Sequence, residues 1–225
     1  MNILSLKNML MMTPILLIAL PVHEFAHGWV AWKMGDPTAK YAGRLTLNPF
    51  KHLDLMGVIM MYLAGVGWAK PVPVNSGYFK NRRTGLFLVA LAGPLSNLLL
   101  GFLSLFVWGI IVKLASIGVI PFDKGNWANV LLTVQDFFQT LVFVNISLAV
   151  FNLIPVPPLD GSRLVSSFVP EESYYRFARY EQYIGLAFLA LVALVPDNIV
   201  GKFISFFALP IYRSMTLVVS FILGI

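Results

Sequence analysis

Long apolar stretches separated by short polar segments are the dominant pattern of the chain. The three clearest cover about residues 9–32, 86–112 and 130–154. A helix needs about 20 apolar residues to cross the hydrocarbon core of a bilayer, and each of these stretches reaches that length. We therefore predict three core spans. Two further apolar stretches, at about residues 183–195 and 199–225, bring the expected number of transmembrane helices to about five.

The segment between the first and second spans, residues 33–85, has a different pattern. Glycine and proline interrupt it repeatedly, so it does not fit one long helix. Residues 41–47 and 71–74 have a strand-like composition, and the apolar stretch 58–66 between them is too short to cross a bilayer. We expect a small β-containing or re-entrant segment here.

The overall composition agrees with a protein that lives in a bilayer. Of the 225 residues, 58% are hydrophobic and 12% are charged, whereas a soluble domain has about 25% charged residues. The predicted fold class is an all-α polytopic membrane protein, with one domain over residues 1–225. The chain contains no cysteine, so any metal ion must be bound by histidine, carboxylate or backbone groups.

The chain has a net charge of +6, and most of its basic residues lie in two polar segments. Residues 33–85 hold eight of the sixteen basic residues, and residues 159–182 hold three. Cytoplasmic loops of membrane proteins are enriched in lysine and arginine, so both segments are expected in the cytoplasm, with the N-terminus outside the cell membrane. No basic helix or aromatic platform accompanies the charge, and nucleic-acid binding is not expected.

The first predicted span contains the sequence His-Glu-Phe-Ala-His at residues 23–27. His23 and His27 share one helix face because they are four residues apart, and this spacing lets two imidazoles bind one Zn²⁺. Glu24 lies beside them and can act as a general base. Ionisable residues inside a membrane are costly and usually mark function, so three unrelated polar residues are the weaker interpretation.

A catalytic zinc site normally has a third protein ligand, and Asp160 is the favoured candidate. It follows a group of prolines that ends the third span, and the predicted topology places it on the same side of the membrane as His23 and His27. Asp160 could instead cap the next helix, with Gly161 as a turn residue. The remaining histidine, His52, is expected to be a loop residue rather than a ligand.

Four motifs in this order resemble the site-2 protease family of intramembrane zinc metalloproteases. They are His-Glu-Phe-Ala-His at 23–27, Arg-Leu-Thr-Leu-Asn-Pro at 44–49, Gly-Pro-Leu-Ser-Asn at 93–97 and Asn-Leu-Ile-Pro-Val-Pro-Pro-Leu-Asp-Gly at 152–161. The likeness covers most of the chain and fits the compact branch of the family. The chain has no room for the PDZ domain that some relatives carry, so substrate selection by such a domain is not expected.

The resemblance implies an endopeptidase that cuts within or near transmembrane segments of other membrane proteins. It implies one Zn²⁺ held by His23, His27 and Asp160, which activates a water molecule, and Glu24 as the base. It further implies that Asn152 helps to bind the substrate backbone or to polarise it at the oxyanion. The expected partners are transmembrane substrates and the lipid bilayer, and no pattern in the sequence assigns an oligomeric state.

Three interpretations stay open at this point. Asn97 lies within a span and either makes a helix–helix hydrogen bond or faces the substrate, and Asn152 could be a structural cap. A transmembrane substrate must unwind before it is cut, because a helix hides its carbonyls in internal hydrogen bonds. We hypothesise that residues 41–48 and 69–75 pair with the extended substrate by strand addition.

A metal-ion transporter and an inactive protease-like binding protein are the alternative functions. Transporters often contain two related halves with broken helices, and the sequence has no such repeat. An inactive relative would be expected to have lost Glu24 or a ligand, and all of these residues are present. The sequence therefore favours a protease.

Overall fold

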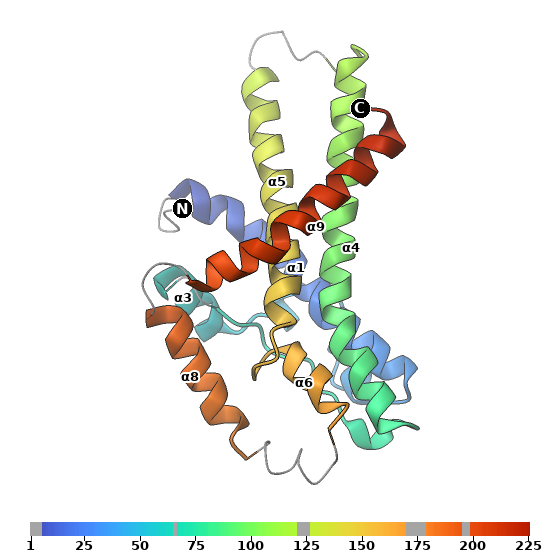
Figure 1. Cartoon of the computed structure of the whole chain (residues 1–225), viewed down its shortest axis with the longest axis vertical. Coiled ribbons are helices and arrows are strands. Elements are labelled where there is room, and N and C mark those ends of the chain that lie inside the picture. Colours follow the sequence, from blue (N-terminus) through green and yellow to red (C-terminus); the bar gives the residue numbers. More distant parts are fainter. Residues whose placement is uncertain (1–5, 65–66, 121–126, 170–178, 195–198) are drawn as a thin grey trace.

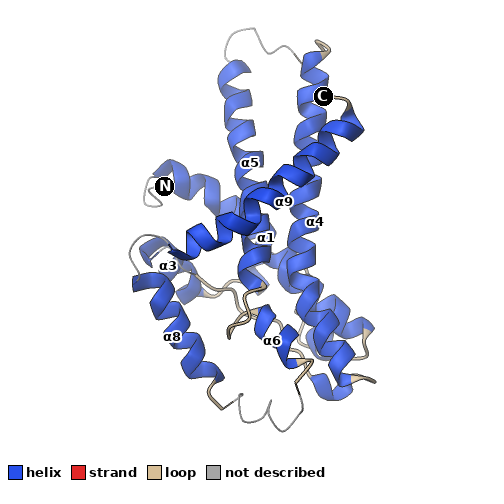
Figure 2. Cartoon of the chain, in the orientation of Figure 1, coloured by secondary structure: helices blue, strands red, loops and turns tan. Residues whose placement is uncertain are grey.

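The computed structural model describes residues 6–64, 67–120, 127–169, 179–194 and 199–225. These parts of the chain are mostly helical and contain no β-strand (Figure 2). The all-α fold class is therefore confirmed for the described residues.

Four helices are long and apolar enough to cross a membrane. They are α1 (Leu6–Lys33), α4 (Arg82–Ser116), α5 (Trp127–Asn152) and α9 (Ile199–Leu223). The first three coincide with the predicted core spans. The chain is thus a multi-pass membrane protein.

The expected fifth span is not confirmed. Its described residues lie in α8 (Glu181–Leu194), a helix of 14 residues, and residue 195 lies outside the described residues. A helix of that length rises about 21 Å, which is short of the roughly 30 Å hydrocarbon core. In Figure 1, α8 lies to the side of the bundle formed by the longer helices.

Helix α4 is the centre of the bundle. It packs against α1 and α5, and α9 crosses both α4 and α5 (Figure 1). Leu105, Val142, Ile146 and Val219 are buried where α4, α5 and α9 meet. Gly109 of α4 allows α9 to approach closely, because a Cβ atom at this position would lie 2.9 Å from Val219. Small residues at such contacts are typical of helix packing in membranes.

The segment between α1 and α4 consists of short helices joined by loops. They are α2 (Thr38–Tyr41), η1 (Pro49–Lys51), α3 (Leu55–Ala64) and η2 (Ser76–Tyr78). Helix α3 has 10 residues, too few to cross a bilayer. It covers the described part of the predicted re-entrant stretch, whose last two residues, 65–66, lie outside the described residues.

The predicted β structure in this segment is not confirmed. The described residues contain only an isolated antiparallel bridge between Leu53 and Ala69. Residues 69–75 instead take their hydrogen bonds mainly from side chains of surrounding elements. Pro71 and Pro73 have no backbone N–H to donate, and such residues are poorly tolerated inside a sheet.

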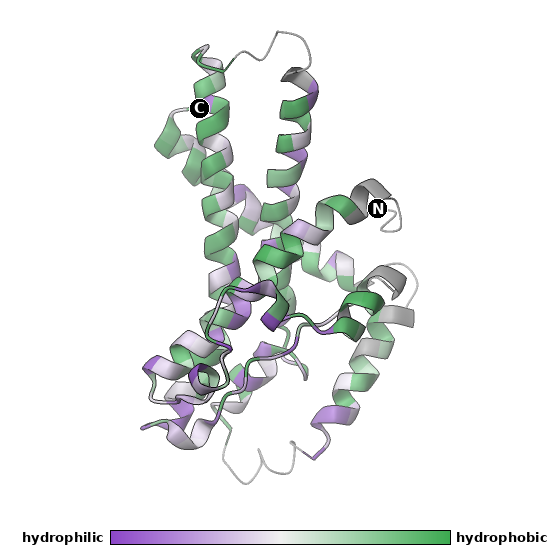
Figure 3. Ribbon diagram, turned by 180° about the vertical axis from the view of Figure 1, so that it is seen from behind, coloured by the Kyte–Doolittle hydropathy of each residue, from purple (hydrophilic) through white to green (hydrophobic). Residues whose placement is uncertain are grey.

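Polar residues gather at one end of the molecule, near the start of α4 and the end of α1 (Figure 3). Trp29 and Trp32 lie there, with Lys33 Nζ over both rings at 5.6 and 4.9 Å. Tryptophan and lysine are typical of the membrane–water interface. This end of α1 therefore lies near an interface.

Candidate active site

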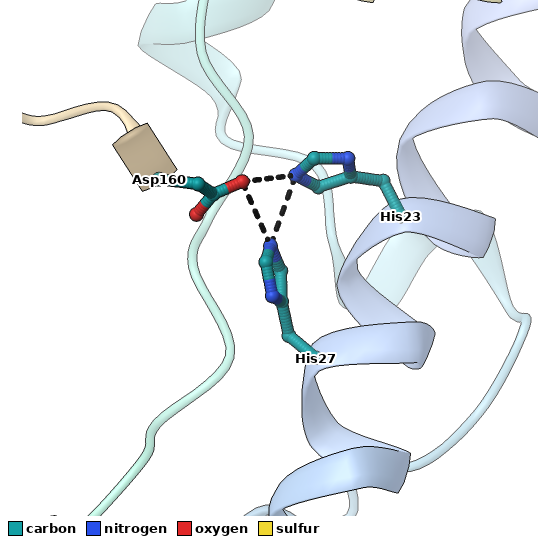
Figure 4. Close-up of side chains that lie close together, drawn as sticks. All are labelled: His23, His27 and Asp160. Carbon is teal, nitrogen blue, oxygen red and sulfur yellow. Dashed lines mark hydrogen bonds and ion pairs between the residues drawn. The ribbon is translucent and has the colours of Figure 1, made fainter. Parts of the chain in front are cut away.

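Three buried side chains converge between α1 and α6 (Asp160–Ser166) (Figure 4). The Nε2 atoms of His23 and His27 are 3.0 Å apart. Asp160 Oδ2 lies 3.2 Å from His23 Nε2 and 3.1 Å from His27 Nε2. The structure thus brings together all three residues that the sequence proposed as metal ligands.

The local chain path explains how Asp160 reaches α1. Helix α5 ends at Asn152, and the proline-rich segment after it turns back into α6. Gly161 makes the turn possible, because a Cβ atom there would clash with the carbonyl groups of Leu153 and Ile154. The N-cap of α6 is Leu159, with no side-chain cap. Asp160 therefore points its carboxylate toward the histidines rather than capping the helix.

Gly93 of α4 leaves the space in front of the two imidazoles open. A Cβ atom at this position would lie 2.6 Å from His23 Nε2 and still closer to His27 Nε2. Any side chain would therefore intrude on the point where the three ligand atoms converge. The Gly-Pro-Leu-Ser-Asn motif at residues 93–97 thus has a steric role at its first position.

A chain of buried amides fixes the tautomer of His23. Asn145 Nδ2 donates to the carbonyl of Leu141 at 2.8 Å, so Asn145 Oδ1 is the acceptor for Asn97 Nδ2, also at 2.8 Å. Asn97 Oδ1 then faces His23 Nδ1 at 2.6 Å. Because an amide oxygen only accepts, His23 Nδ1 carries the proton, and its Nε2 keeps a lone pair.

The other imidazole is fixed in the same way. His27 Nδ1 lies 2.7 Å from the carbonyl oxygen of Val89 and must donate to it. Both Nε2 lone pairs and the Asp160 carboxylate therefore point to one place. Three acceptors this close repel one another unless a cation lies among them, and their ligand atoms all lie within 4.8 Å of each other. Two imidazoles and a carboxylate are a donor set that suits zinc, so these residues fit a metal ion.

The charge state of Asp160 agrees with this role. Burial raises the pKa of its carboxyl group, but the two neighbouring imidazoles lower it more strongly and hold that pKa below its usual range. The group is therefore a carboxylate, the form that binds metal ions.

Glu24 is half-buried and lies beside this cluster. Its Oε2 atom accepts a hydrogen bond of 2.8 Å from the backbone N–H of Val72. Val72 belongs to the extended segment 69–75, which is fixed on both sides of this contact. Arg44 donates to the Lys70 carbonyl at 2.6 Å, and Asp36 accepts from the Asn75 N–H at 2.6 Å. The carboxylate of Glu24 is thereby held by a firmly attached segment.

The remaining residues that the sequence singled out lie as follows. Asn97 is fully buried behind His23 and makes helix–helix hydrogen bonds, which is one of the two alternatives for it. Asn152 is half-buried at the end of α5 and donates to the carbonyl of Leu148 at 2.9 Å. His52 is fully buried in the loop before α3, and its Nε2 lies 2.8 Å from the Thr46 carbonyl.

Two contacts of the site were missed by sequence reasoning. Asn145 had a signal that could have found it, since it is a second amide in the middle of an apolar span, like Asn97. The Val72 contact with Glu24 uses a backbone N–H, and no side-chain pattern marks such a donor.

Comparison with known proteins completes the description of the site. The family model of Peptidase family M50 matches residues 11–192. "Putative zinc metalloprotease YwhC" of Bacillus subtilis is 41% identical over 188 residues, which cover 84% of this chain and 81% of the relative. "Putative zinc metalloprotease Rip2" of Mycobacterium tuberculosis is 32% identical over 187 residues, covering 80% of this chain and 65% of the relative. No solved structure gives a significant match.

Proposed function

Because the chain belongs to peptidase family M50 and is a metalloprotease, we propose that it is an intramembrane zinc endopeptidase. It hydrolyses peptide bonds within or near transmembrane segments of other membrane proteins. The observation that carries this proposal is the convergence of His23, His27 and Asp160 beside Glu24, with both histidines on the membrane-spanning helix α1. His27 lies six residues before the end of α1, about 9 Å along the helix.

The proposed cofactor is one zinc ion held by His23, His27 and Asp160. The relatives' names support the choice of zinc, as does the mixture of imidazole and carboxylate donors. When bound, zinc supplies Lewis-acid chemistry that polarises a water molecule and the substrate carbonyl.

Glu24 is the proposed general base. Its carboxylate takes a proton from the attacking water and delivers it to the leaving amine. The hydrogen bond from Val72 restricts the side chain and aims it. A base must lie within hydrogen-bond reach of the proton that it moves, and the position of Glu24 directly after His23 supports this role.

Substrate binding is proposed at Asn152 and at the extended segment 69–75. The segment has few backbone N–H groups left to donate to a substrate, because the N–H of Val72 donates to Glu24 and both Pro71 and Pro73 lack an N–H. A substrate strand that pairs here would therefore donate its own N–H groups to carbonyls of the segment. Our hypothesis is therefore strand addition in which the substrate donates the hydrogen bonds and the segment accepts them.

The proposed orientation places the active site toward the cytoplasm. The basic segment between α1 and α4 begins at Lys33, six residues after His27 of the metal cluster. Lysine and arginine are enriched on the cytoplasmic side. The N-terminus would then lie outside the cell membrane.

Co-expression with a panel of single-span membrane proteins tests the function. We expect wild-type protein to cleave at least one of them and the Glu24→Gln variant to cleave none, while the variant keeps its zinc. Asp160→Ala should lose zinc, measured as metal content of the purified chain. Cleavage that persists in Glu24→Gln would refute the proposed base, and metal uptake into vesicles without cleavage would favour a transporter.

A further inference from the structure

Two tryptophans and two lysines form a cluster where the membrane-spanning helix α1 ends. The apolar part of this helix ends at Lys33. Lys33 Nζ lies 5.6 Å from the centre of the Trp29 ring and 4.9 Å from the centre of the Trp32 ring. Lys40 Nζ also lies 4.9 Å from the Trp32 ring. All three distances are within the roughly 6 Å of a cation–π contact, so one indole ring attracts two ammonium groups.

The turn after α1 brings Lys40 back to this helix. Gly35 has a φ of 106°, a backbone conformation that favours glycine, and it reverses the chain. Asp36 then accepts a hydrogen bond of 2.9 Å from the backbone N–H of Thr38, the first residue of α2. Helix α2, which contains Lys40, packs against α1. The place of Lys40 beside Trp32 is therefore set by a defined turn between the two helices.

No acidic side chain neutralises the two ammonium groups. Lys33 and Lys40 are exposed, and neither forms an ion pair with a described residue. Asp36 is the one acidic residue at positions 25–53, but it is buried and its carboxylate accepts three other hydrogen bonds. Because both ammonium groups lie 4.9 Å from the same ring centre, they are at most twice that distance apart. Like charges this close repel one another, so the cluster attracts an anion.

The surroundings of the cluster indicate which anion it meets. Trp29 is 44% exposed, and Tyr41, next to Lys40, is 84% exposed. Exposed tryptophan and tyrosine rings are typical of the headgroup level of a bilayer. Hydrophilic residues also gather at this end of the molecule (Figure 3). The anionic group that a bilayer presents at this level is the phosphate of a phospholipid headgroup.

We propose that Trp29, Trp32, Lys33 and Lys40 bind the headgroup of an anionic phospholipid. Both lysines contact its phosphate, and the two indole rings lie at the same level of the bilayer. A zwitterionic lipid such as phosphatidylcholine fits less well, because its own cationic group adds a third positive charge beside the lysines. The cytoplasmic leaflet is the anionic one, which agrees with the proposed orientation of the chain.

Lipid bound here fixes the depth of the metal cluster, and this consequence rests on the proposed function. Trp29 follows His27 by two residues, about 3 Å along the axis of α1. The bound headgroup therefore holds the ligands at a set distance below the membrane surface. An extended substrate advances about 3.3 Å per residue. A small change of depth thus moves the bond that reaches Glu24 by about one residue.

Native mass spectrometry of the purified, zinc-loaded chain measures lipid binding. Phosphatidylglycerol and phosphatidylcholine with identical acyl chains are added in detergent. We expect the wild-type chain to prefer phosphatidylglycerol, and Lys33→Gln and Lys40→Gln each to weaken its binding by roughly fivefold. Lys51→Gln is the matched control, because Lys51 is exposed in the same polar segment but lies over no aromatic ring of the described residues. An equal loss in Lys51→Gln would overturn the site in favour of diffuse charge attraction.

Two further arms test the indole ring and the source of the phosphate. Trp32→Leu removes the ring that both lysines share, and binding of phosphatidylglycerol should weaken by about fivefold, whereas Trp32→Phe keeps an aromatic face and should lose less. Unchanged binding in Trp32→Leu would refute the role of the ring. A large excess of inorganic phosphate should leave the lipid bound. Release of the lipid by inorganic phosphate would show a site for free phosphate instead.

Cleavage in vesicles tests the link to the active site, with the membrane protein that is cut in the co-expression panel as substrate. The product of the double variant Lys33→Gln, Lys40→Gln should be cut about one residue away from the wild-type position, at wild-type zinc content. An unchanged cut in a chain that has lost its lipid would refute the effect on depth. If the wild-type chain cuts no member of the panel, the proposed protease function fails, and the binding measurements still decide the lipid site.

Discussion

Two asparagines and one histidine show how polar residues are arranged inside an apolar bundle. Asn145, Asn97 and His23 form a directional chain from the carbonyl of Leu141 to the cluster of ligand atoms. Each partner is satisfied, as buried polar groups must be. Partners of this kind fix the ring orientation of ligating histidines. Asn145 thus acts as a positioning residue although it touches none of the three ligands.

Isosteric variants of Asn145 separate hydrogen bonding from packing. Asn145→Leu keeps the volume but removes the acceptor for Asn97, and zinc affinity should fall by about 10- to 100-fold. Asn145→Asp should lose less, because a neutral carboxyl group can donate to the Leu141 carbonyl and still accept from Asn97. Zinc affinity is measured by competition with a chelator on the purified chain. An Asn145→Leu variant that binds zinc as tightly as wild type would show that Asn145 serves only packing.

Gly93 offers a second test at the scale of one atom. In Gly93→Ala the added methyl group would lie against both Nε2 atoms, so zinc content should drop to near zero while the bundle stays folded. Gly101→Ala in the same helix is the control, since its Cβ atom would meet neighbours at 3.5 Å, an ordinary contact. Metal analysis and thermal unfolding report both effects. Zinc retained at the wild-type level in Gly93→Ala would show that the metal lies elsewhere.

At the scale of elements, the extended segment 69–75 is held by contacts that replace a sheet. Glu24, Arg44 and Asp36 each bind one of its backbone groups. The strand-like composition of the segment was visible in the sequence, but its partners come from α1 and the loops that follow α1. Composition indicates that the chain is extended, but it does not indicate which groups the chain forms hydrogen bonds with. The β segment could therefore not be predicted correctly from composition alone.

Proline substitutions distinguish two roles of this segment. Val72→Pro removes the N–H that binds Glu24, and cleavage should fall by about 10- to 100-fold, as for loss of a hydrogen bond to a charged group. Val74→Pro leaves the contact between Val72 and Glu24 in place. If that contact is what matters, the cleavage rate should fall less than in Val72→Pro. Rates are compared on zinc-loaded variants. Equal losses in both would show that the hydrogen bond between Val72 and Glu24 is not what matters, and unchanged rates in both would refute a role for that bond in cleavage.

The spans themselves were predictable because length and hydropathy determine them. The first three predicted spans match α1, α4 and α5 to within a few residues. The apolar stretch that became α8 shows the limit of this argument, since its 14 residues are apolar but too few to cross. The three ligands could be proposed from the sequence for a different reason. The helical spacing of His23 and His27 and the proline break before Asp160 are both visible in it.

At the scale of the whole molecule, the proposed site lies toward the end of the bundle where α1 ends and α4 begins, and hydrophilic residues gather at that end (Figure 3). The ends of α1 and α5 and the beginning of α4 all meet there. A proteolytic site in this place acts on the cytoplasmic part of a substrate span if the positive end faces inward. The orientation of the chain therefore decides on which side the product is released.

The natural absence of cysteine makes this orientation easy to measure. Single cysteines at Lys80 and Ser116, both exposed and at opposite ends of α4, are treated with a membrane-impermeant maleimide on intact cells. We expect Ser116→Cys to react at once and Lys80→Cys only after the membrane is permeabilised. The reverse pattern would contradict the proposed cytoplasmic site.

The separation of the ligands along the chain also concerns folding. His27 and Asp160 are 133 positions apart, so a metal ion bound to both would act as a cross-link between α1 and α6. An ion that binds only the folded state adds its binding free energy to the stability of that state. The ion that supports hydrolysis would thus also hold α6 and the proline-rich segment before it against α1. Metal supply would then set how much of the chain is assembled, as well as how fast it works.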